Sequence, residues 1–457
     1  MALTPLTTDL YELTMMAGYV NAGRHRARAT FELFVRRMPP NRSCLIAAGL
    51  EPALDYIEGL RFKPEDIAWL QALPVFAGVG APFFDYLRGF RFTGDIWAVR
   101  EGTPFFPNEP ILRVTAPLAE AQLLETALLA ILNFQTSIAS KAHRVVQAGA
   151  GHPVMEFGAR RAHGIDAAIY AARAAYVGGC AGTSLVEAGR RFGIPVSGTM
   201  AHSWVLAAPS ELEAFMTFTA LYGRDTVLLL DTYDVAAAAA IVARSGLRPA
   251  AVRIDSGDLL ALSRMVREVL DRGGLAETRI LVSGDLDEWK IRDLVAAGAP
   301  IDGFAVGTAL TTSEDAPALG GVYKLVEIEE DGQVRRVMKR STGKTTWPGR
   351  KQVWRMVEDG RAVRDIIGLE AGPSPLDGPG FAPDAQPPAG AIALLEPVVR
   401  GGVRLPQPPS LTDARAYRAE MIALLPPGFS RLDDPPDYPV DRTEALQQLI
   451  DAAGVIG

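Results

Sequence analysis

The segment from Thr226 to Asp258 reads TVLLLDTYDVAAAAAIVARSGLRPAAVRIDSGD and shows the same arrangement twice. A short, mainly apolar run, first Thr226–Leu230 and then Ala250–Ile254, is followed directly by acidic residues. Runs of this kind, without regular alternation of polar and apolar residues, are typical of parallel strands buried on both faces. The segment therefore predicts two parallel strands of an α/β protein, each ending in a polar turn.

The same arrangement continues on both sides of this segment. Four further runs lie at Pro153–Phe157, Ile194–Ser197, Arg279–Val282 and Gly303–Val306, and helical stretches separate most of the runs. One such stretch begins at Ser210 with SELE, which is a capping-box start. Alternating strands and helices imply a parallel sheet. Six such units, with an amphipathic helix leading in, predict an irregular TIM-like α/β barrel.

Residues 1–115 mix helical and strand-like sequence. Leu10 begins a predicted helix that Thr8 or Asp9 can cap. Three runs typical of half-buried strands follow, at Ala29–Val35, Gly94–Arg100 and Ile111–Val114. We therefore predict a mixed α+β N-terminal domain over residues 1–115 and the barrel domain over residues 116–330.

The pattern changes again after residue 330. A basic stretch, 339–355, and a proline-rich stretch, 373–388, precede a predicted helix at Arg442–Ala453. Closely spaced prolines are typical of loops and linkers. We therefore predict a C-terminal extension over residues 331–457, in which residues 373–388 form a surface loop.

The composition excludes several classes of protein. The chain has 457 residues and a formal net charge of −7, which argues against a general nucleic-acid binder. Cys44 and Cys180 are too few for a disulfide framework or a four-thiolate zinc site. The N-terminus lacks the basic start and apolar core of a signal peptide. The longest strictly apolar run, Val235–Ala243, has nine residues, well short of the roughly 20 of a membrane span. We expect a soluble cytoplasmic protein.

Polar residues and glycines follow every predicted barrel strand, which is where a parallel α/β barrel places its active site. Arg160 and Arg253 could clamp a carboxylate or a pyrophosphate. Backbone N–H groups after Gly284 and Gly307 could bind phosphate at helix starts. Four acidic residues could hold Mg²⁺ or ribose hydroxyls: Asp231, Asp255, Asp258 and Asp285. Together these groups suggest an anionic, phosphorylated substrate.

Each of these residues also has a purely structural explanation. A glycine after a strand commonly serves the turn, and an Asp that opens a helix commonly caps it. The joint placement of one polar motif at each strand end favours a ligand site. An aldolase-type or enolase-type barrel would need a Lys at a strand end, but Lys290 lies inside a predicted helix and Lys141 precedes the first strand.

Several of these motifs, in order along the chain, resemble those of the nicotinate phosphoribosyltransferase family, which are type II phosphoribosyltransferases. The resemblance runs from residue 8 to about 355, and the last hundred or so residues match weakly. The matching stretches are Thr8–Met15 (TDLYELTM), Phe31–Arg37 (FELFVRR), Glu156–Arg161 (EFGARR), Gly198–Ser203 (GTMAHS), Leu230–Asp234 (LDTYD), Val252–Asp258 (VRIDSGD), Ser283–Leu286 (SGDL), Gly303–Thr308 (GFAVGT) and Pro348–Lys351 (PGRK).

The resemblance implies a reaction. Nicotinate attacks C1 of 5-phosphoribosyl-1-pyrophosphate and yields nicotinate mononucleotide and pyrophosphate, the first step of NAD salvage from nicotinic acid. In the family, ATP hydrolysis is coupled to this step and a histidine is transiently phosphorylated. His202 stands at the place of that histidine, and a neutral imidazole is a competent phosphoryl acceptor. Mg²⁺ and a homodimer with shared active sites are also implied.

The resemblance also implies residue roles. Tyr11, from the partner subunit, and Phe157 would sandwich the pyridine ring. Arg160 and Arg253 would contact nicotinate and the pyrophosphate donor, and Asp255 would orient the ribose or hold Mg²⁺ through water. The groups that would hold the phosphoribosyl part are Asp231, Gly284, Asp285, Gly307 and Thr308. Arg340 and Lys351 would add cationic contacts near ATP or phosphate, although this part of the resemblance is weaker.

Ser184 bears on the choice between an acid and an amide substrate. The nicotinamide-using relatives carry an Asp at this place in the motif Gly182-Thr183-Ser184, and an Asp accepts from an amide but repels a carboxylate. Ser184 therefore favours nicotinate. A nicotinamide enzyme and a non-catalytic barrel that binds a phosphorylated ligand are the alternatives, and quinolinate phosphoribosyltransferases have much shorter chains. A structural zinc is not expected, because neither cysteine lies in the C-terminal part.

Overall fold

The structure is a computed structural model, and it describes residues 3–339, 345–370, 390–406, 410–429 and 431–455. The chain forms two compact units, a flanking unit of residues 1–136 with 318–457 and a central unit of residues 137–317. This division differs from the predicted segments 1–115, 116–330 and 331–457. The physical reason is strand pairing, since strands from both ends of the chain share one sheet. The proline-rich stretch 373–388 lies outside the described residues.

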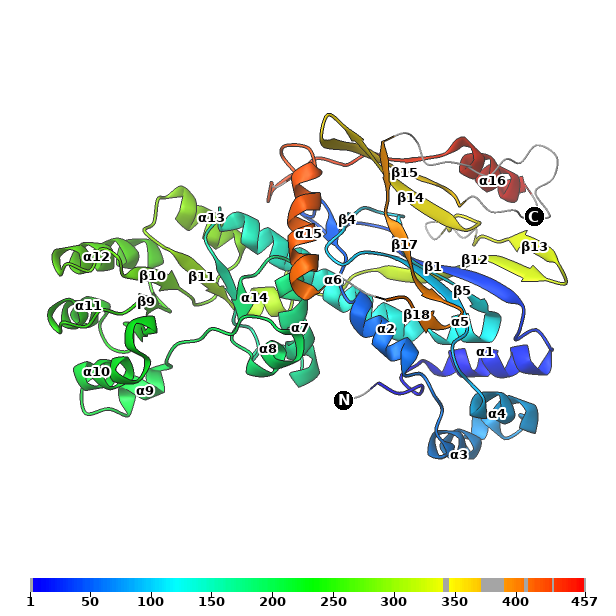
Figure 1. Cartoon of the computed structure of the whole chain (residues 1–457), viewed down its shortest axis with the longest axis horizontal. Helices are drawn as coiled ribbons and strands as arrows, with labels where there is room; N and C mark the ends of the chain where they lie inside the picture. The colour runs from blue at the N-terminus through cyan, green and yellow to red at the C-terminus, as the bar shows by residue number, and fades with distance from the viewer. Residues whose placement is uncertain (1–2, 340–344, 371–389, 407–409, 430, 456–457) are drawn as a thin grey trace. The chain divides into compact units, whose positions relative to one another are not determined.

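The flanking unit is built on a seven-stranded antiparallel sheet (Figure 1). Its strand order is β13 (Gln333–Arg336), β12 (Gly321–Glu330), β1 (Arg28–Val35), β5 (Pro110–Pro117), β3 (Asp95–Val99), β17 (Leu395–Arg400) and β18 (Val403–Arg404). The predicted strands near residues 29, 94 and 111 are β1, β3 and β5, so these predictions are confirmed. The other four strands, β12, β13, β17 and β18, come from the distant part of the chain after residue 320.

The described part of the flanking unit also has two smaller sheets, seven α-helices that lie wholly within it, and the 3₁₀ helix η1 (Pro74–Phe76). The sheets are β16 (Ala391–Ala393), β14 (Lys351–Glu358), β15 (Arg361–Leu369) and β19 (Val440–Arg442), in that order, and β2 (Leu45–Ile46) with β4 (Pro104–Phe105). The helices are α1 (Leu10–Asn21), α2 (Leu50–Glu58), α3 (Pro64–Ala72), α4 (Ala81–Arg88), α5 (Leu118–Leu123), α15 (Leu411–Leu424) and α16 (Glu444–Val455). The predicted helices at Leu10 and Arg442–Ala453 correspond to α1 and α16.

The central unit holds the predicted barrel as a curled parallel sheet of six strands. Their order is β7 (Gly182–Thr183), β6 (Val154–Glu156), β11 (Gly303–Val306), β10 (Arg279–Val282), β9 (Ala251–Ile254) and β8 (Val227–Leu229). Since the first strand, β6, pairs with the last, β11, the order follows that of a barrel that closes on itself. No ladder joins β7 to β8 within the described residues. The prediction of an irregular α/β barrel is confirmed as a half-barrel.

The predicted strand Ile194–Ser197 is the one barrel strand that does not form a ladder. It contributes a single bridge between Val196 and Thr183. The physical reason is Pro195, which has no N–H to donate to a ladder. The carbonyl of Pro195 accepts from the Thr183 N–H at 3.0 Å, and the Thr183 carbonyl accepts from the Ser197 N–H at 3.0 Å.

Helices follow most of the barrel strands. They are α7 (Ile165–Val177), α8 (Val186–Phe192), α9 (His202–Leu206), α10 (Glu211–Tyr222), α11 (Val235–Arg244), α12 (Leu259–Arg272), α13 (Glu288–Ala296) and α14 (Thr308–Thr311), and the long α6 (Glu125–Ala148) leads in. Of these helices, α12 lies beside β9 and β10 (Figure 1). The Ser210 hydroxyl accepts from the Glu213 N–H at 3.2 Å, so the predicted cap of α10 is confirmed. No helix in the described ranges has the length and apolar character that crossing a membrane requires.

In β6, β9, β10 and β11, one face is buried and the other face includes a partly exposed residue. In β9, Val252 and Ile254 are fully buried, whereas Arg253 between them is half-buried. In the same register, Arg253 pairs with Leu281 of β10, which is also half-buried. The prediction that these strands are buried on both faces is therefore confirmed at Ala251 and Leu229 and wrong at Arg253, on the face that is partly exposed. That face leaves room for a polar group such as Arg253 inside the curled sheet.

Candidate active site

The strand ends of the central unit bring most predicted site residues to one edge of the sheet, because parallel strands share the same carboxyl edge. Phe157 and Arg160 follow β6, Ser184 follows β7, and His202 begins α9. The others are in or after β8 to β11: Asp231, Arg253, Asp255, Gly284, Asp285, Gly307 and Thr308.

Asp231 and Asp255 form a linked pair of carboxylates across β8 and β9. One oxygen of Asp231, Oδ2, accepts from the Asp255 N–H at 3.1 Å and from the Ser256 hydroxyl at 2.6 Å. The Ser283 hydroxyl at the end of β10 donates to Asp255 Oδ1. The second oxygen of Asp231, Oδ1, is buried and has no hydrogen-bond partner in the described part of the chain. A buried carboxylate oxygen without a partner suits a ligand hydroxyl or a cation-bound water.

His202 is held from two sides at the start of α9. Its Nδ1 lies 3.2 Å from the Thr232 hydroxyl, and its Nε2 lies 3.8 Å from Asp255 Oδ2. The side chain is 41% exposed, so it is oriented by its neighbours and still reachable by a ligand. His202 therefore lies beside the residues that follow β8 and β9.

Arg253 is a largely buried cation facing these groups. Its Nη1 donates to the Thr199 hydroxyl at 2.5 Å, and its Nε is buried without a hydrogen-bond partner among the described residues. Burial lowers the pKa of Arg253, whereas Asp255 and Asp231 raise it and Arg160 lowers it. An arginine keeps its charge under such a shift. The Arg253 guanidinium thus has an N–H available for a ligand. The charges of Arg253 and Arg160 also interact, and an anionic ligand can be bound by such a pair of cations.

Two glycines allow the strand ends to pack closely. Gly284 has φ +93°, and a Cβ built there would lie 1.9 Å from the backbone oxygen of Asp255. A Cβ at Gly158 would lie 2.4 Å from Thr311 Cβ and 2.8 Å from the Gly307 carbonyl oxygen. These glycines are therefore needed for packing, whatever their backbone N–H groups bind.

Asp258 is an exposed N-cap of α12, since its Oδ1 accepts from the Ala261 N–H at 3.0 Å.

Glu156 is a polar residue of this region to which sequence reasoning assigned no role. It is 1% exposed, and its two carboxylate oxygens accept from the Gly158 N–H at 2.5 Å and the Thr183 hydroxyl at 2.6 Å. Burial raises the pKa of the Glu156 carboxyl, and these two hydrogen bonds lower it. The sequence signal was an acid placed inside a predicted buried strand rather than after it.

Three predicted residues lie outside the central unit. Tyr11 is on α1 of the flanking unit, where its side chain is 46% exposed. The ammonium group of Lys351 is buried, lies 2.8 Å from Glu32 Oε2 and donates to the carbonyls of Trp347 and Gly349. These three partners hold the ammonium group in the core of the flanking unit, and its predicted contact with ATP or phosphate stays a prediction. Arg340 lies outside the described residues.

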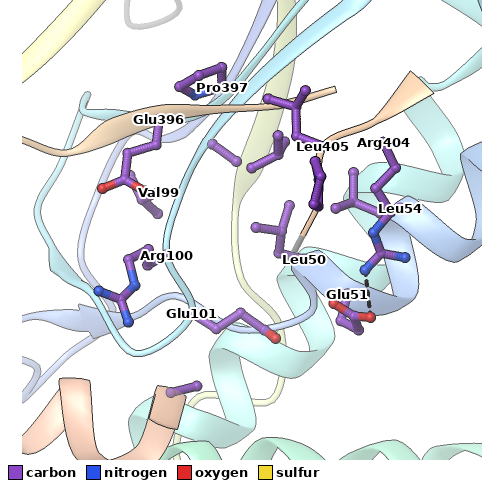
Figure 2. A pocket seen from close by; sticks show the side chains of 14 residues that line it. Leu50, Glu51, Leu54, Val99, Arg100, Glu101, Glu396, Pro397, Arg404 and Leu405 are labelled. Carbon is purple, nitrogen blue, oxygen red and sulfur yellow. Dashed lines mark ion pairs between the residues drawn. The ribbon is translucent and has the colours of Figure 1, made fainter. Parts of the chain in front are cut away.

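A cavity of about 390 Å³ lies elsewhere, in the flanking unit, and none of the predicted site residues lines it (Figure 2). Its charges are largely neutralised locally. Arg404 pairs with Glu51 at 2.5 Å and with Asp55 at 2.9 Å, and Glu101 accepts from the Gly49 N–H at 2.5 Å. Arg404, Glu51 and Glu101 are therefore already engaged within the protein, and we assign this cavity no substrate.

Comparisons with known proteins agree along almost the whole chain. Residues 6–133, 153–363 and 350–450 match the family models described as the nicotinate phosphoribosyltransferase N-terminal domain, the nicotinate phosphoribosyltransferase family and the nicotinate phosphoribosyltransferase C-terminal domain. Nicotinate phosphoribosyltransferases of Mycobacterium tuberculosis and Bacillus subtilis are 45% and 40% identical to the chain. The alignments cover 95% of this chain and 90% of the former, and 96% of this chain and 93% of the latter.

Solved structures give the same result. The crystal structure of human nicotinic acid phosphoribosyltransferase is 30% identical, covers 97% of this chain and 99% of its own, and superposes with a TM-score of 0.82. The structure of a nicotinate-nucleotide pyrophosphorylase from Pyrococcus furiosus is 26% identical, with a TM-score of 0.71 and coverage of 92% and 95%. The similarity therefore extends over both units.

Proposed function

The chain belongs to the nicotinate phosphoribosyltransferase family, and we propose that it couples the family's reaction to ATP hydrolysis through transient phosphorylation of His202. Its activity is the transfer of the phosphoribosyl group of 5-phosphoribosyl-1-pyrophosphate to nicotinate. The products are nicotinate mononucleotide and pyrophosphate, and the reaction serves NAD biosynthesis. Relatives at 40–45% identity over nearly the full length support this activity.

The observation that supports phosphorylation is the setting of His202. In the tautomer that carries its proton on Nδ1, that proton is donated to Thr232, and the lone pair of Nε2 is free. Nε2 attacks the γ-phosphorus of ATP, the bond from that phosphorus to the β–γ bridging oxygen breaks, and ADP leaves. Water later attacks the phosphorus, the P–N bond breaks, and inorganic phosphate is released.

Arg253 and the acidic pair serve the phosphoribosyl donor. The Arg253 guanidinium, together with Arg160, neutralises the charge that develops on the leaving pyrophosphate. Asp231 Oδ1, which is buried and has no hydrogen-bond partner among the described residues, accepts from a ribose hydroxyl. Gly284, Asp285, Gly307 and Thr308 present backbone N–H groups for the 5-phosphate.

Mg²⁺ fits this donor set as a partner of the substrates rather than of the protein alone. Within the described residues, no cluster of three or more His, Cys, Asp or Glu side chains suits a metal ion. Asp255 would hold the ion through water with a carboxylate oxygen, the ligand type that Mg²⁺ prefers, and the phosphates of the substrates would bind it as well. When bound, Mg²⁺ neutralises charge on the pyrophosphate leaving group.

We further propose a cytoplasmic homodimer in which Tyr11 completes the pyridine site of the partner. Leu10, Tyr11 and Met15 lie close together in the sequence of α1, and each is more than a third exposed. Exposed apolar side chains gathered on one helix are typical of an interface. A Tyr11 ring contributed in this way would face Phe157 across the substrate ring.

Incubation of the protein with ATP labelled at the γ-phosphate tests the proposed coupling. We expect acid-labile, base-stable label on the protein, because phosphohistidine is a phosphoramidate, and faster mononucleotide formation with ATP than without it. The measurements are retained label and a steady-state assay of mononucleotide with and without ATP. An unlabelled protein whose rate does not respond to ATP would exclude the proposal.

Replacing Ser184 by Asp tests the preference for nicotinate. We expect kcat/KM for nicotinate to fall about 100-fold, because like charges placed together at a binding site cost several kcal/mol. Ser184→Asn introduces a side chain of nearly the same size as Asp but without its charge, so its kcat/KM for nicotinate should fall far less. Steady-state kinetics with nicotinate and nicotinamide measure both variants. An equal fall for Asp and Asn would mean that size, not charge, decides the preference.

A further inference from the structure

Glu156 is a buried acid that the proposed reaction leaves without a task. It ends β6, and its side chain is buried between the turn after β6 and strand β7. A carboxylate that is taken out of water must be compensated by hydrogen bonds. Glu156 obtains two, one from each neighbouring segment.

The first hydrogen bond fixes the turn that carries Phe157. Glu156 Oε1 accepts from the Gly158 N–H at 2.5 Å, directly after Phe157. The Phe157 N–H itself donates to the Val306 carbonyl at 2.8 Å. The backbone on both sides of the Phe157 side chain is therefore held, and the direction of its ring is restricted.

The second hydrogen bond fixes the segment that carries Ser184. Glu156 Oε2 accepts from the Thr183 hydroxyl at 2.6 Å, and that hydroxyl accepts from the Leu185 N–H at 3.0 Å. The Ser184 N–H donates to the Glu156 backbone carbonyl at 3.0 Å. The backbone around Ser184 is thus held by hydrogen bonds to Glu156 and Thr183.

The direction of each hydrogen bond matches a carboxylate at this position. Thr183 has one hydroxyl proton, which goes to Glu156, and its lone pairs serve Leu185. Gly158 offers only an N–H, so both neighbours of the Glu156 side chain are donors. An acceptor with two oxygens is the group that satisfies both at once.

We propose that Glu156 is a positioning residue for nicotinate recognition, which ties the end of β6 to β7 and so sets the spacing between Phe157 and Ser184. The inference rests on the proposed roles of Phe157 and Ser184. It assigns Glu156 no contact with substrate. Its consequence is that the Glu156–Thr183 bond controls the KM for nicotinate and leaves the chemical step and the phosphorylation of His202 unchanged.

The pair Thr183→Val and Thr183→Ser tests this inference with little change in volume. Valine removes the hydroxyl, and serine keeps it. We expect Thr183→Val to raise the KM for nicotinate about tenfold, the scale of one lost hydrogen bond, while kcat, the KM for 5-phosphoribosyl-1-pyrophosphate and labelling by ATP stay within about twofold. Thr183→Ser should restore the nicotinate KM.

Glu156→Gln and the double variant Glu156→Gln/Thr183→Val complete the test. Substitutions that remove the same hydrogen bond do not have additive effects. The KM of the double variant for nicotinate should therefore be no higher than that of the worse single variant. The inference would be overturned if Thr183→Val left the KM for nicotinate unchanged or raised the KM of both substrates equally. Additive effects of the two single variants on the KM for nicotinate would also overturn it. An inactive wild-type protein would instead overturn the proposed function, so the two failures are distinguishable.

Discussion

Replacing His202 by Ala is expected to abolish ATP-dependent labelling of the protein and the stimulation of mononucleotide formation by ATP. Alanine removes the nitrogen that accepts the phosphoryl group, and none of the groups in contact with His202, the Thr232 hydroxyl and the Asp255 carboxylate, is a comparable nucleophile. Phosphoribosyl transfer without ATP should continue, because Arg253 and Asp231 do not depend on the imidazole. Label retained on the protein and the ratio of ATP hydrolysed to mononucleotide formed measure the effect.

His152→Ala is the matched control for this prediction. His152 is exposed in the turn before β6, so its loss removes a histidine of the same unit that contacts none of the site residues described above. We expect this variant to be labelled and coupled like the wild type. Full labelling of His202→Ala, or loss of labelling in His152→Ala, would contradict the assignment of His202 as the phosphoryl acceptor.

The sequence predicted those parts of the fold that depend on local pattern. Runs such as Ala250–Ile254 and Gly303–Val306 have the length and composition of parallel strands, and the residues after them had to meet at one edge. The same kind of pattern predicts a full strand at Ile194–Ser197, but Pro195 limits the pairing there to a single bridge. The local sequence pattern therefore predicts where each strand ends, but it does not predict whether the strand pairs with a neighbouring strand.

The sequence could not predict features that depend on contacts between distant residues. The basic stretch around Lys351 predicts a contact with ATP or phosphate, but nothing in it indicates that the ammonium group is buried beside Glu32, more than 300 residues away in the sequence. In the same way, nothing local to Glu156 indicates that Thr183 will donate to it across 27 residues. The pairing of β3 with β17, which joins both ends of the chain in one unit, is likewise a long-range result.

Gly284→Ala is expected to lower kcat/KM for 5-phosphoribosyl-1-pyrophosphate by about 100-fold, the loss that a displacement of about an ångström at reacting groups can cause. Two effects combine at this position. The φ of +93° is unfavourable for any residue with a Cβ, at a cost of about 1–3 kcal/mol. The new methyl group would also lie 1.9 Å from the Asp255 backbone oxygen and 2.8 Å from its carbonyl carbon.

The clash matters for function because Asp255 sits at the centre of the site. Its backbone must move away from residue 284, and its carboxylate, which accepts from Ser283 and lies 3.8 Å from His202 Nε2, moves with it. Gly298→Ala separates the two effects, since Gly298 has φ +64° but no atom within 4 Å of a built Cβ. This control should lose about 1 kcal/mol of stability and keep its kinetics. Thermal unfolding and steady-state kinetics of both variants therefore decide the matter, and equal kinetic losses would show that backbone strain, rather than displacement of Asp255, is the cause.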